Sequence, residues 1–272
     1  MVSVIIVQYN GLTLTKEAIK SFMRWHKSLN YEIILVDNGS KDFNRKEFVN
    51  DFPDLKIFEL KKNEGFGKAN NLGAKSASGE ILYFLNNDTI TNEEYLSKVE
   101  DRFNKDPEVG ILGPRLLNPD NTYQLSHGKL PSFLREISDK LVYFVFEKKW
   151  ELPVKMLVAR FDNEQYTGWV TGAAMFVRKS VFEKIGGFDE NFFMYFEDKE
   201  LCKRVQLRGN KIIYYPKVSL VHLKGGSSGG DNSGFTQKEY RRSQMYYYKN
   251  YRNHLENVLL KIFLKITRKY PD

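Results

Sequence analysis

Short apolar segments alternate with helical patterns along the first 90 residues of this 272-residue chain. The apolar segments are residues 2–7, 31–36, 55–60 and 80–85, and the helical patterns between them cover residues 12–29, 44–52 and 68–76. Strands that alternate with helices favour a parallel, doubly wound sheet, because parallel neighbours need a crossover connection. The sequence therefore predicts an α/β protein with a Rossmann-like, mostly parallel sheet and flanking helices.

Polar side chains follow three of these strands at the point where each strand ends. They are Tyr9 and Asn10 after the first strand, Asp37 and Asn38 after the second, and Asn86, Asn87 and Asp88 after the fourth. In open α/β sheets, ligands bind at the carboxyl ends of the strands. These clusters therefore predict a ligand site at that edge of the sheet.

Asp37 and Asp88 each allow two interpretations. Asp37 opens an Asp-Asn-Gly-Ser sequence typical of a turn, and a carboxylate at this strand end can also accept from a ribose hydroxyl or a base N–H. Asp88 suits a hard divalent cation that bridges to a diphosphate, and it also suits an Asx turn before the next helix. The residues alone leave these alternatives open.

The loop after the third strand contains Gly65 and Gly67 but has Asn70 where a dinucleotide fingerprint needs its third glycine. It also follows the third strand rather than the first, so a Rossmann dehydrogenase is disfavoured. The glycines allow a nucleotide to approach the backbone closely, although a simple loop at the start of a helix explains them equally well.

Two adjacent carboxylates, Glu197 and Asp198, follow an aromatic run and begin a helical pattern. The first turn of a helix favours anions, so helix capping is one explanation. The polar clusters upstream and His222 downstream favour a catalytic site instead. Cys202, on the same helix, is expected to be buried rather than reactive.

The second half of the chain has a less regular pattern. The predicted elements are a helix over 134–149, strands over 169–177, 211–216 and 218–223, a glycine–serine loop over 225–234, and a helix over 237–269. His222 lies at the end of one of these strands, directly before the loop. A lone histidine is usually structural, but this position also suits a metal ligand or a phosphate contact.

The composition is that of an ordinary globular protein, with 42% hydrophobic and 28% charged residues. Cys202 is the only cysteine, so a disulfide within the chain is impossible and a reducing compartment is expected. The N-terminus is a strand pattern without a signal peptide, and no apolar run is long enough to cross a bilayer. We therefore expect a cytoplasmic protein.

The formal net charge of +8 is concentrated in the tail, where residues 236–272 hold nine Lys or Arg against three acidic residues. A nucleic-acid-binding surface is not expected from that distribution. The tail also carries an apolar stripe at helical spacing, formed by Leu255, Val258, Leu259, Ile262, Phe263 and Ile266. This pattern predicts an interfacial helix on an anionic membrane, or a helix that packs on the catalytic domain or in a homodimer.

Seven ordered motifs together resemble the inverting family-2 glycosyltransferases of GT-A fold, especially their rhamnosyltransferase-like branch. The motifs are residues 4–10, 36–40, 63–67, 85–88, 171–175, 186–190 and 195–198. The resemblance implies a GT-A domain over residues 1–235, with a nucleotide-binding half at 1–90 and an acceptor-binding half at 91–235. A basic, amphipathic C-terminal helix over residues 236–272 would extend it.

The resemblance also implies roles for individual residues. Asp198 resembles the catalytic base of the family's Glu-Asp pair, and Asp88 the last residue of its metal motif. His222 resembles a further ligand of the metal or the diphosphate. The implied nucleotide-binding residues are Tyr9, Asn10, Asp37, Asn38, Gly67, Asn71 and Asn87, and the implied acceptor-binding residues are Trp169, Thr171, Gly172 and Asp189. For Trp169, core packing is an equally good explanation.

One departure from the family pattern concerns the metal. Asn86 stands where the family has the first aspartate of its metal motif. A neutral amide oxygen binds Mg²⁺ or Mn²⁺ more weakly than a carboxylate does. A divalent metal, Mn or Mg, is still expected, held by Asp88, His222 and Asn86.

The implied reaction is an inverting, single-displacement transfer from a nucleotide-diphosphate sugar. The donor would be a UDP- or dTDP-sugar, with dTDP-rhamnose as one candidate, and the acceptor a hydroxyl of a glycan or lipid-linked glycan in cell-surface polysaccharide synthesis. Neighbouring helix positions point about 100° apart, so Glu197 and Asp198 cannot share one role, and Asp198 is predicted to be the base. The alternatives are a metal-dependent sugar nucleotidyltransferase and a non-catalytic protein that binds nucleotide sugars.

Overall fold

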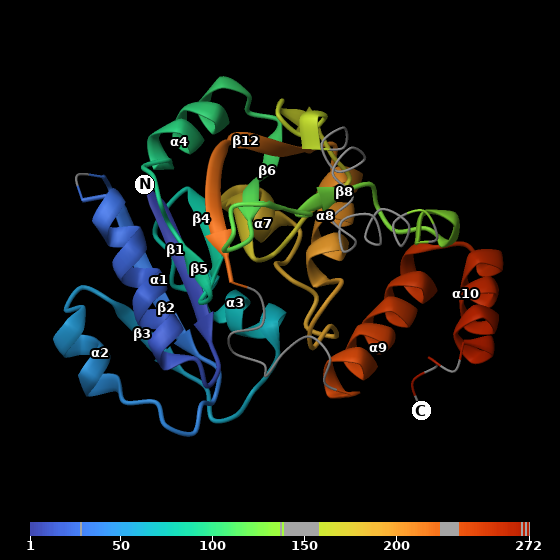
Figure 1. Cartoon of the computed structure of the whole chain (residues 1–272), viewed down its shortest axis with the longest axis horizontal. Helices are drawn as coiled ribbons and strands as arrows, with labels where there is room; N and C mark the ends of the chain where they lie inside the picture. The colour runs from blue at the N-terminus through green and yellow to red at the C-terminus, as the bar shows by residue number, and fades with distance from the viewer. Residues whose placement is uncertain are drawn as a thin grey trace.

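A mixed sheet runs through the computed structural model, which describes residues 1–27, 29–136, 138, 158–223, 234–267, 269 and 271 (Figure 1). Its main path has the order β3-β2-β1-β4-β11-β6-β12-β5. The strands are β1 (Val2–Gln8), β2 (Tyr31–Asp37), β3 (Lys56–Glu59), β4 (Ile81–Asn86), β5 (Thr89–Ile90), β6 (Val109–Leu117), β11 (Ala174–Arg178) and β12 (Lys211–His222). The four N-terminal strands are parallel, as the alternating pattern predicts.

Helices cover both faces of this sheet because each strand turns alternate apolar side chains to opposite sides. One apolar core lies under α1 (Leu12–Trp25), α2 (Arg45–Asp51) and α4 (Leu96–Lys105). The other lies under α3 (Phe66–Lys75), α7 (Lys179–Lys184) and α8 (Glu197–Leu207). The predicted fold class, an α/β sheet with flanking helices, is confirmed.

The carboxyl ends of the N-terminal strands meet at one edge. Gln8 of β1 pairs in register with Asp37 of β2, and Val7 pairs with Asn86 of β4. The polar residues that follow these strands are therefore neighbours, as the sequence pattern predicts.

The second half differs from the predicted elements in several places. The strand expected over 169–177 is two strands, β10 (Trp169–Val170) and β11, separated by a turn. The strands expected over 211–216 and 218–223 form the single strand β12, whose register shifts between Tyr215 and Ser219. Pro216 lies within this irregularity, where its missing N–H is tolerated. The strand β6 was not predicted.

Three short strand pairings complete the described part of the sheet structure. β7 (Tyr123–Gln124) pairs with β6, and β9 (Gln165–Tyr166) pairs with β12. β8 (His127–Gly128) pairs with β10 in a separate ribbon. Most of the predicted helix over 134–149 and the predicted loop over 225–234 lie outside the described residues.

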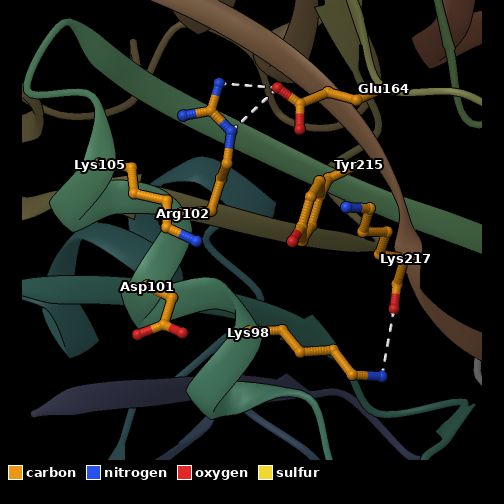
Figure 2. Close-up of a pocket in the computed structure, with 7 residues that line it drawn as sticks. All are labelled: Lys98, Asp101, Arg102, Lys105, Glu164, Tyr215 and Lys217. Atoms are coloured by element: carbon orange, nitrogen blue, oxygen red, sulfur yellow. Dashed lines mark hydrogen bonds and ion pairs between the residues drawn. The ribbon is translucent and has the colours of Figure 1, made fainter.

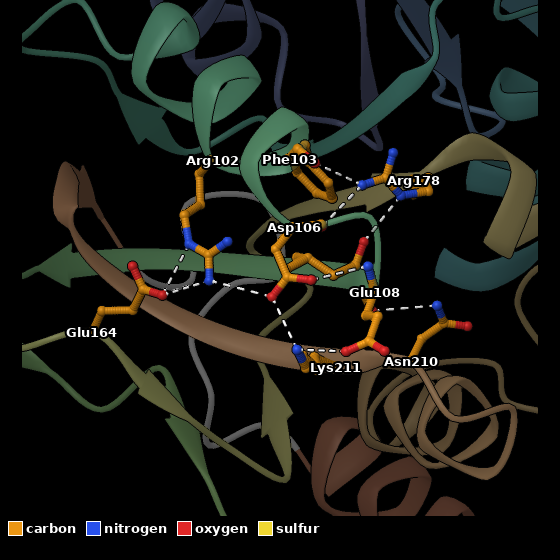
Figure 3. Close-up of polar contacts among 9 residues, drawn as sticks. Arg102, Phe103, Asp106, Glu108, Glu164, Arg178, Asn210 and Lys211 are labelled. Atoms are coloured by element: carbon orange, nitrogen blue, oxygen red, sulfur yellow. Dashed lines mark hydrogen bonds and ion pairs between the residues drawn. The ribbon is translucent and has the colours of Figure 1, made fainter.

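A polar network fastens the end of α4 to the neighbouring strands (Figure 3). Asp106 accepts a hydrogen bond from Lys211 at 3.1 Å, and Lys211 also pairs with Glu108 at 2.6 Å. Arg102 pairs with Glu164 at 2.7 Å. None of the predicted site residues belongs to this network, so its role is structural.

The tail forms two helices, α9 (Gly234–Tyr251) and α10 (His254–Ile266), rather than the single helix predicted over 237–269. The break lies at Asn253, whose side chain accepts the backbone N–H of Glu256 at 2.9 Å and caps α10. Asparagine is among the most favourable residues at this capping position. Figure 1 shows α9 and α10 side by side at one end of the molecule.

Helix α9 packs on the aromatic segment that precedes α8. Phe192 and Phe196 share an apolar cluster with Tyr247 and Tyr248 of α9, and Leu260 and Leu264 of α10 belong to the same cluster. Ser243 of α9 donates to the backbone oxygen of Met194 at 2.8 Å. One face of the tail is therefore part of the core, so removing residues 236–272 would expose this cluster.

Candidate functional site

The first polar cluster forms around Asp37, which is buried at the end of β2. Its carboxylate accepts hydrogen bonds from the Gln8 side chain and from the backbone N–H of Ser40 at 3.1 Å. The Ser40 hydroxyl in turn accepts the backbone N–H of Asn10 at 2.8 Å. These bonds are the ones that the turn interpretation expects, and a nucleoside contact for Asp37 and the exposed Tyr9 stays a prediction.

Several residues predicted to contact the nucleotide make their bonds within the protein. Both ends of the Asn71 amide bond the backbone of Phe188, each at 2.9 Å. Asn87 donates to Thr15 at 3.0 Å, and Asn38 donates to Asn63 at 3.0 Å. These side chains hold loops and α1 in place, and a direct nucleotide role for them stays a prediction.

The glycines after β3 have packing reasons for their lack of a side chain. Gly65 has φ 89°, and a Cβ there would come within 2.5 Å of the Phe193 backbone oxygen. A Cβ on Gly67 would come within 3.1 Å of Phe188. The loop therefore lies against the segment before α8, and close approach of a nucleotide is not needed to explain either glycine.

The residues predicted to bind metal come together in the structure. β5 and β12 pair so that His222 lies opposite Thr89, next to Asp88. The Nε2 atom of His222 is 3.2 Å from a carboxylate oxygen of Asp88 and 3.4 Å from the amide nitrogen of Asn86. The structure thus brings all three predicted ligands into one cluster.

Gln124, which the sequence analysis missed, orients His222. The side-chain oxygen of Gln124 lies 2.7 Å from Nδ1 of His222, and its nitrogen donates to Asn118 at 3.0 Å and to the His222 backbone oxygen at 3.2 Å. An amide oxygen only accepts, so Nδ1 carries the proton, and in the neutral imidazole Nε2 is then the nitrogen with the lone pair. Metal-binding histidines are usually held by such a contact on the second ring nitrogen.

The donor set fits a divalent cation. Within the described residues, no group of three or more His, Cys, Asp or Glu side chains is arranged around one point. Asp88 and His222 instead offer a carboxylate and an imidazole, and Asn86 adds an amide oxygen if its amide is turned. Mn²⁺ accepts this mixture of oxygen and nitrogen ligands.

The predicted carboxylate pair lies in the first turn of α8, as expected. Asp198 accepts the backbone N–H of Gly172 at 3.2 Å and remains half-buried, whereas Glu197 is buried. Burial and the charge of Asp198 raise the pKa of Glu197. Burial also raises the pKa of Asp198, while the charge of Lys199 and the N–H of Gly172 oppose that rise.

Two aromatic residues before α8 adopt a left-handed backbone. Tyr195 has φ 66° and Phe196 has φ 67°, a conformation that is costly for bulky side chains. The ring of Phe196 lies 5.3 Å from that of Tyr240 and 5.6 Å from that of Tyr247, both on α9. Packing against α9 therefore stabilises the strained backbone of Tyr195 and Phe196, which directly precedes Glu197 and Asp198.

Glu200 is a second residue that sequence analysis missed. Its buried carboxylate bonds the guanidinium of Arg204 and the hydroxyl of Tyr251, the last residue of α9. The spacing of four between Glu200 and Arg204 was an available signal for the ion pair. Nothing local in the sequence indicates Tyr251.

The predicted acceptor residues have different environments. Trp169 is buried against Gly128, which favours the core-packing alternative, although the Lys199 ammonium lies 4.9 Å from its ring. The hydroxyl of Thr171 accepts the backbone N–H of Ala173 at 3.3 Å. Asp189 accepts the Tyr246 hydroxyl at 3.2 Å, so it is tied to α9.

A pocket of about 330 Å³ lies between α4 and β12 and shares no residue with these clusters (Figure 2). Its lining is Lys98, Asp101, Arg102, Lys105, Glu164, Tyr215 and Lys217. Arg102 is already paired with Glu164, and Lys98 donates to the Lys217 backbone oxygen at 3.3 Å. The pocket therefore contains none of the residues predicted to act in catalysis or to bind nucleotide, acceptor or metal.

Comparison with known proteins identifies the family. The family described as "Glycosyl transferase family 2" matches residues 3–186, and "N-terminal domain of galactosyltransferase" matches residues 157–224. The chain is 29% identical over 212 residues to N-acetylglucosaminyl-diphospho-decaprenol L-rhamnosyltransferase of Mycobacterium tuberculosis, covering 73% of this chain and 68% of that protein. It is 24% identical over 227 residues to dTDP-rhamnosyl transferase RfbF of Shigella flexneri, covering 82% and 69%.

A solved structure supports the same fold. Mannosyltransferase PcManGT of Pyrobaculum calidifontis, in complex with GDP-Man and Mn²⁺, superposes with a TM-score of 0.63 at 16% identity. The likeness covers 93% of this chain and 64% of that chain, so this chain spans less than two thirds of the solved one. The family match decides against both a nucleotidyltransferase and a non-catalytic binding protein. The chain belongs to glycosyl transferase family 2: it is a glycosyltransferase of GT-A fold, similar to the rhamnosyltransferases of that family.

Proposed function

We propose that this glycosyltransferase moves a sugar from a nucleotide-diphosphate donor to an acceptor hydroxyl by single displacement, with inversion at the anomeric carbon. One observation carries the proposal: a single turn joins the metal cluster to the carboxylate pair. The N–H of Gly172 donates to Asp198 at 3.2 Å, and the oxygen of the next residue, Ala173, accepts the N–H of Asn86 at 2.9 Å. The proposed base and one proposed ligand, Asn86, are thus held by the backbone of two consecutive residues.

Asp198 is the proposed base. It is the more exposed of the two carboxylates, so an acceptor hydroxyl can reach it and transfer its proton. Glu197 is buried and its pKa is raised, which keeps it in its protonated form over a wider pH range. Its proposed part is to support the turn rather than to take the acceptor's proton.

Asp88, His222 and Asn86 are the proposed ligands of Mn²⁺ or Mg²⁺. A divalent ion there would neutralise charge on the departing nucleoside diphosphate. Gln124 keeps Nε2 of His222 available as a lone pair, and Asp88 supplies the full negative charge. Asp37, fixed by Gln8 and Ser40, is the proposed contact to the nucleoside.

For the substrates, the names of two relatives support a narrower proposal. One relative is a dTDP-rhamnosyl transferase, and the other acts on a diphospho-decaprenol-linked sugar. We infer a dTDP- or UDP-sugar donor, with dTDP-rhamnose first among the candidates, and a lipid-linked glycan acceptor in cell-surface polysaccharide synthesis. Such an acceptor would place the enzyme at the cytoplasmic face of the cell membrane.

A donor screen tests this function. The purified chain would be incubated with UDP-, dTDP- and GDP-sugars, with and without Mn²⁺, and release of the nucleoside diphosphate measured. We expect metal-dependent hydrolysis of one dTDP- or UDP-sugar that Asp198→Asn abolishes and Asp101→Asn, an exposed change on α4, leaves intact. Equal rates of hydrolysis by the wild type and Asp198→Asn would contradict the proposal. So would a wild-type protein that uses none of these donors.

A further inference from the structure

A fully buried threonine, Thr15, lies near the start of α1. Its backbone N–H continues the helix by donating to the Gly11 oxygen at 2.9 Å. Valine has almost the same shape and a similar helix propensity, so packing alone does not explain a threonine at this position. A buried hydroxyl needs hydrogen-bond partners, and the partners of this one indicate its role.

The Thr15 hydroxyl bonds two different segments of the chain. Its Oγ1 atom lies 2.8 Å from the Gly11 backbone oxygen and 3.0 Å from the side-chain nitrogen of Asn87. A carbonyl oxygen only accepts, so the hydroxyl hydrogen points at Gly11 and Oγ1 is left to accept from Asn87. The nitrogen end of the Asn87 amide therefore faces Thr15, because the oxygen end would bring two acceptors together.

This orientation turns the side-chain oxygen of Asn87 away from Thr15. Among the described residues no donor bonds that oxygen, although Asn87 is only 5% exposed. Asn87 stands between Asn86 and Asp88, two of the proposed metal ligands, and it is itself predicted to contact the nucleotide. The turn that carries these ligands therefore also carries an acceptor oxygen that a bound nucleotide can use.

Gly11 links this contact to the proposed nucleoside site. Its N–H donates to the side-chain oxygen of Gln8 at 3.3 Å, while its own oxygen accepts from Thr15. The side-chain nitrogen of Gln8 donates in turn to Asp37. A continuous series of buried hydrogen bonds therefore runs through Asp37, Gln8, Gly11, Thr15 and Asn87.

We propose that Thr15 is a positioning residue for the donor, whose hydroxyl fixes the Asn87 amide so that the amide oxygen accepts from the bound nucleotide. Thr15 is buried, so it acts through Asn87 rather than by touching the nucleotide. Its link to Asp37 keeps this acceptor at a fixed place relative to the nucleoside contact. The inference rests on the proposed function, because it assigns the nucleotide to this edge of the sheet.

Ser21, on the same helix, provides a matched comparison. Its hydroxyl donates to the Ala18 oxygen at 2.9 Å and accepts the backbone N–H of Thr91 at 3.1 Å. Like Thr15, it bonds a backbone oxygen earlier in α1 and a donor in the segment after β4. A backbone N–H has no second end to orient, so Ser21 only fastens the helix to that segment.

Calorimetric titration of the full chain with dTDP or UDP, in the presence of Mn²⁺, tests the inference. Thr15→Val should weaken binding about three- to tenfold, the scale of one hydrogen bond. Thr15→Ser keeps the hydroxyl and should bind nearly as the wild type does. Ser21→Ala should leave the affinity unchanged, because it removes a fastening contact only. Equal affinities of Thr15→Val and the wild type would overturn the inference.

A double-mutant cycle shows whether Thr15 acts through Asn87. Asn87→Ala removes the amide that Thr15 orients, so Thr15→Val should cause no further loss of affinity in that background. Losses that simply add would mean that Thr15 supports the fold independently of Asn87, and they would also overturn the inference.

The side-chain NH₂ signal of Asn87 in NMR spectra of the free protein gives a readout that needs no nucleotide. Asn87→Ala identifies this signal by its loss. We expect slow hydrogen exchange in the wild type and in Thr15→Ser, and faster exchange in Thr15→Val. A wild type that binds neither nucleotide would contradict the proposed function, and the exchange rate would still decide whether Thr15 fixes the amide. Unchanged exchange in Thr15→Val would show that it does not.

Discussion

The Nδ1 atom of His222 lies 2.7 Å from the side-chain oxygen of Gln124. Because this oxygen can only accept, the contact selects the tautomer of neutral His222 in which Nε2, the nitrogen next to Asp88, has the lone pair. A glutamine on the two-residue strand β7 therefore orients the histidine among the proposed metal ligands.

Replacing Gln124 by leucine should weaken Mn²⁺ binding about 10- to 100-fold, because the histidine loses the contact that orients it. Gln124→Glu, which keeps an accepting oxygen, should lose less. Calorimetric titration of Mn²⁺ in the presence of the nucleoside diphosphate measures both. Equal affinities for Gln124→Leu and wild type would remove Gln124 from this role.

Changes at the two other proposed ligands, Asn86 and Asp88, should change metal binding in opposite directions. Asn86→Asp replaces a dipole by a charge and should tighten Mn²⁺ binding, whereas Asp88→Ala should abolish metal-dependent binding of the nucleoside diphosphate. The same titration measures both variants. Nucleotide affinity that is unchanged by EDTA in the wild type would argue against a metal at this cluster.

The charge of Lys199 should determine where the activity falls off at acidic pH. Asp198 acts in its ionised form, so the rate rises as pH passes upward through its pKa. Lys199 lowers that pKa, and Lys199→Met should therefore move the acidic limb of kcat/KM to higher pH. Lys203→Met, one turn further along α8, is the control. A limb that stays in place or moves to lower pH would be inconsistent with Asp198 as the titrating group.

The link between α8 and α9 should matter for stability. Glu200 is buried and holds both Arg204 and Tyr251, so Glu200→Gln leaves the Arg204 charge without its partner and should cost about 3–5 kcal/mol. Tyr251→Phe removes one hydrogen bond and should cost about 1–3 kcal/mol, since a buried acceptor loses a donor. Urea denaturation measures both. Two variants as stable as wild type would mean that α9 is held by its aromatic contacts alone.

The elements that the sequence predicted well are those with strong local signals. The strands β1 to β4 are apolar runs with turn residues between them, and their parallel pairing aligns Gln8, Asp37 and Asn86 at one edge. The first turn of α8 was also predictable, because the acidic pair precedes a helical spacing. These features need only local propensity and the rules of parallel sheets.

Other features depend on contacts between distant segments. The Gln124–His222 pair joins residues 98 positions apart, and Tyr251 reaches Glu200 across 51 positions. The tail was misread as a single helix because its helical spacing continues through the capping residue Asn253. The prediction also did not separate the two faces of α10, because periodicity alone cannot show that Leu260 and Leu264 lie on the buried face.

The most direct test of the central claim compares Asp198→Asn with Glu197→Gln in sugar transfer at saturating donor. We predict that Asp198→Asn lowers kcat about 10²- to 10⁴-fold with unchanged affinity for the nucleoside diphosphate, and that Glu197→Gln has a milder effect. A nearly silent Asp198→Asn beside an inactive Glu197→Gln would contradict the assignment of the base.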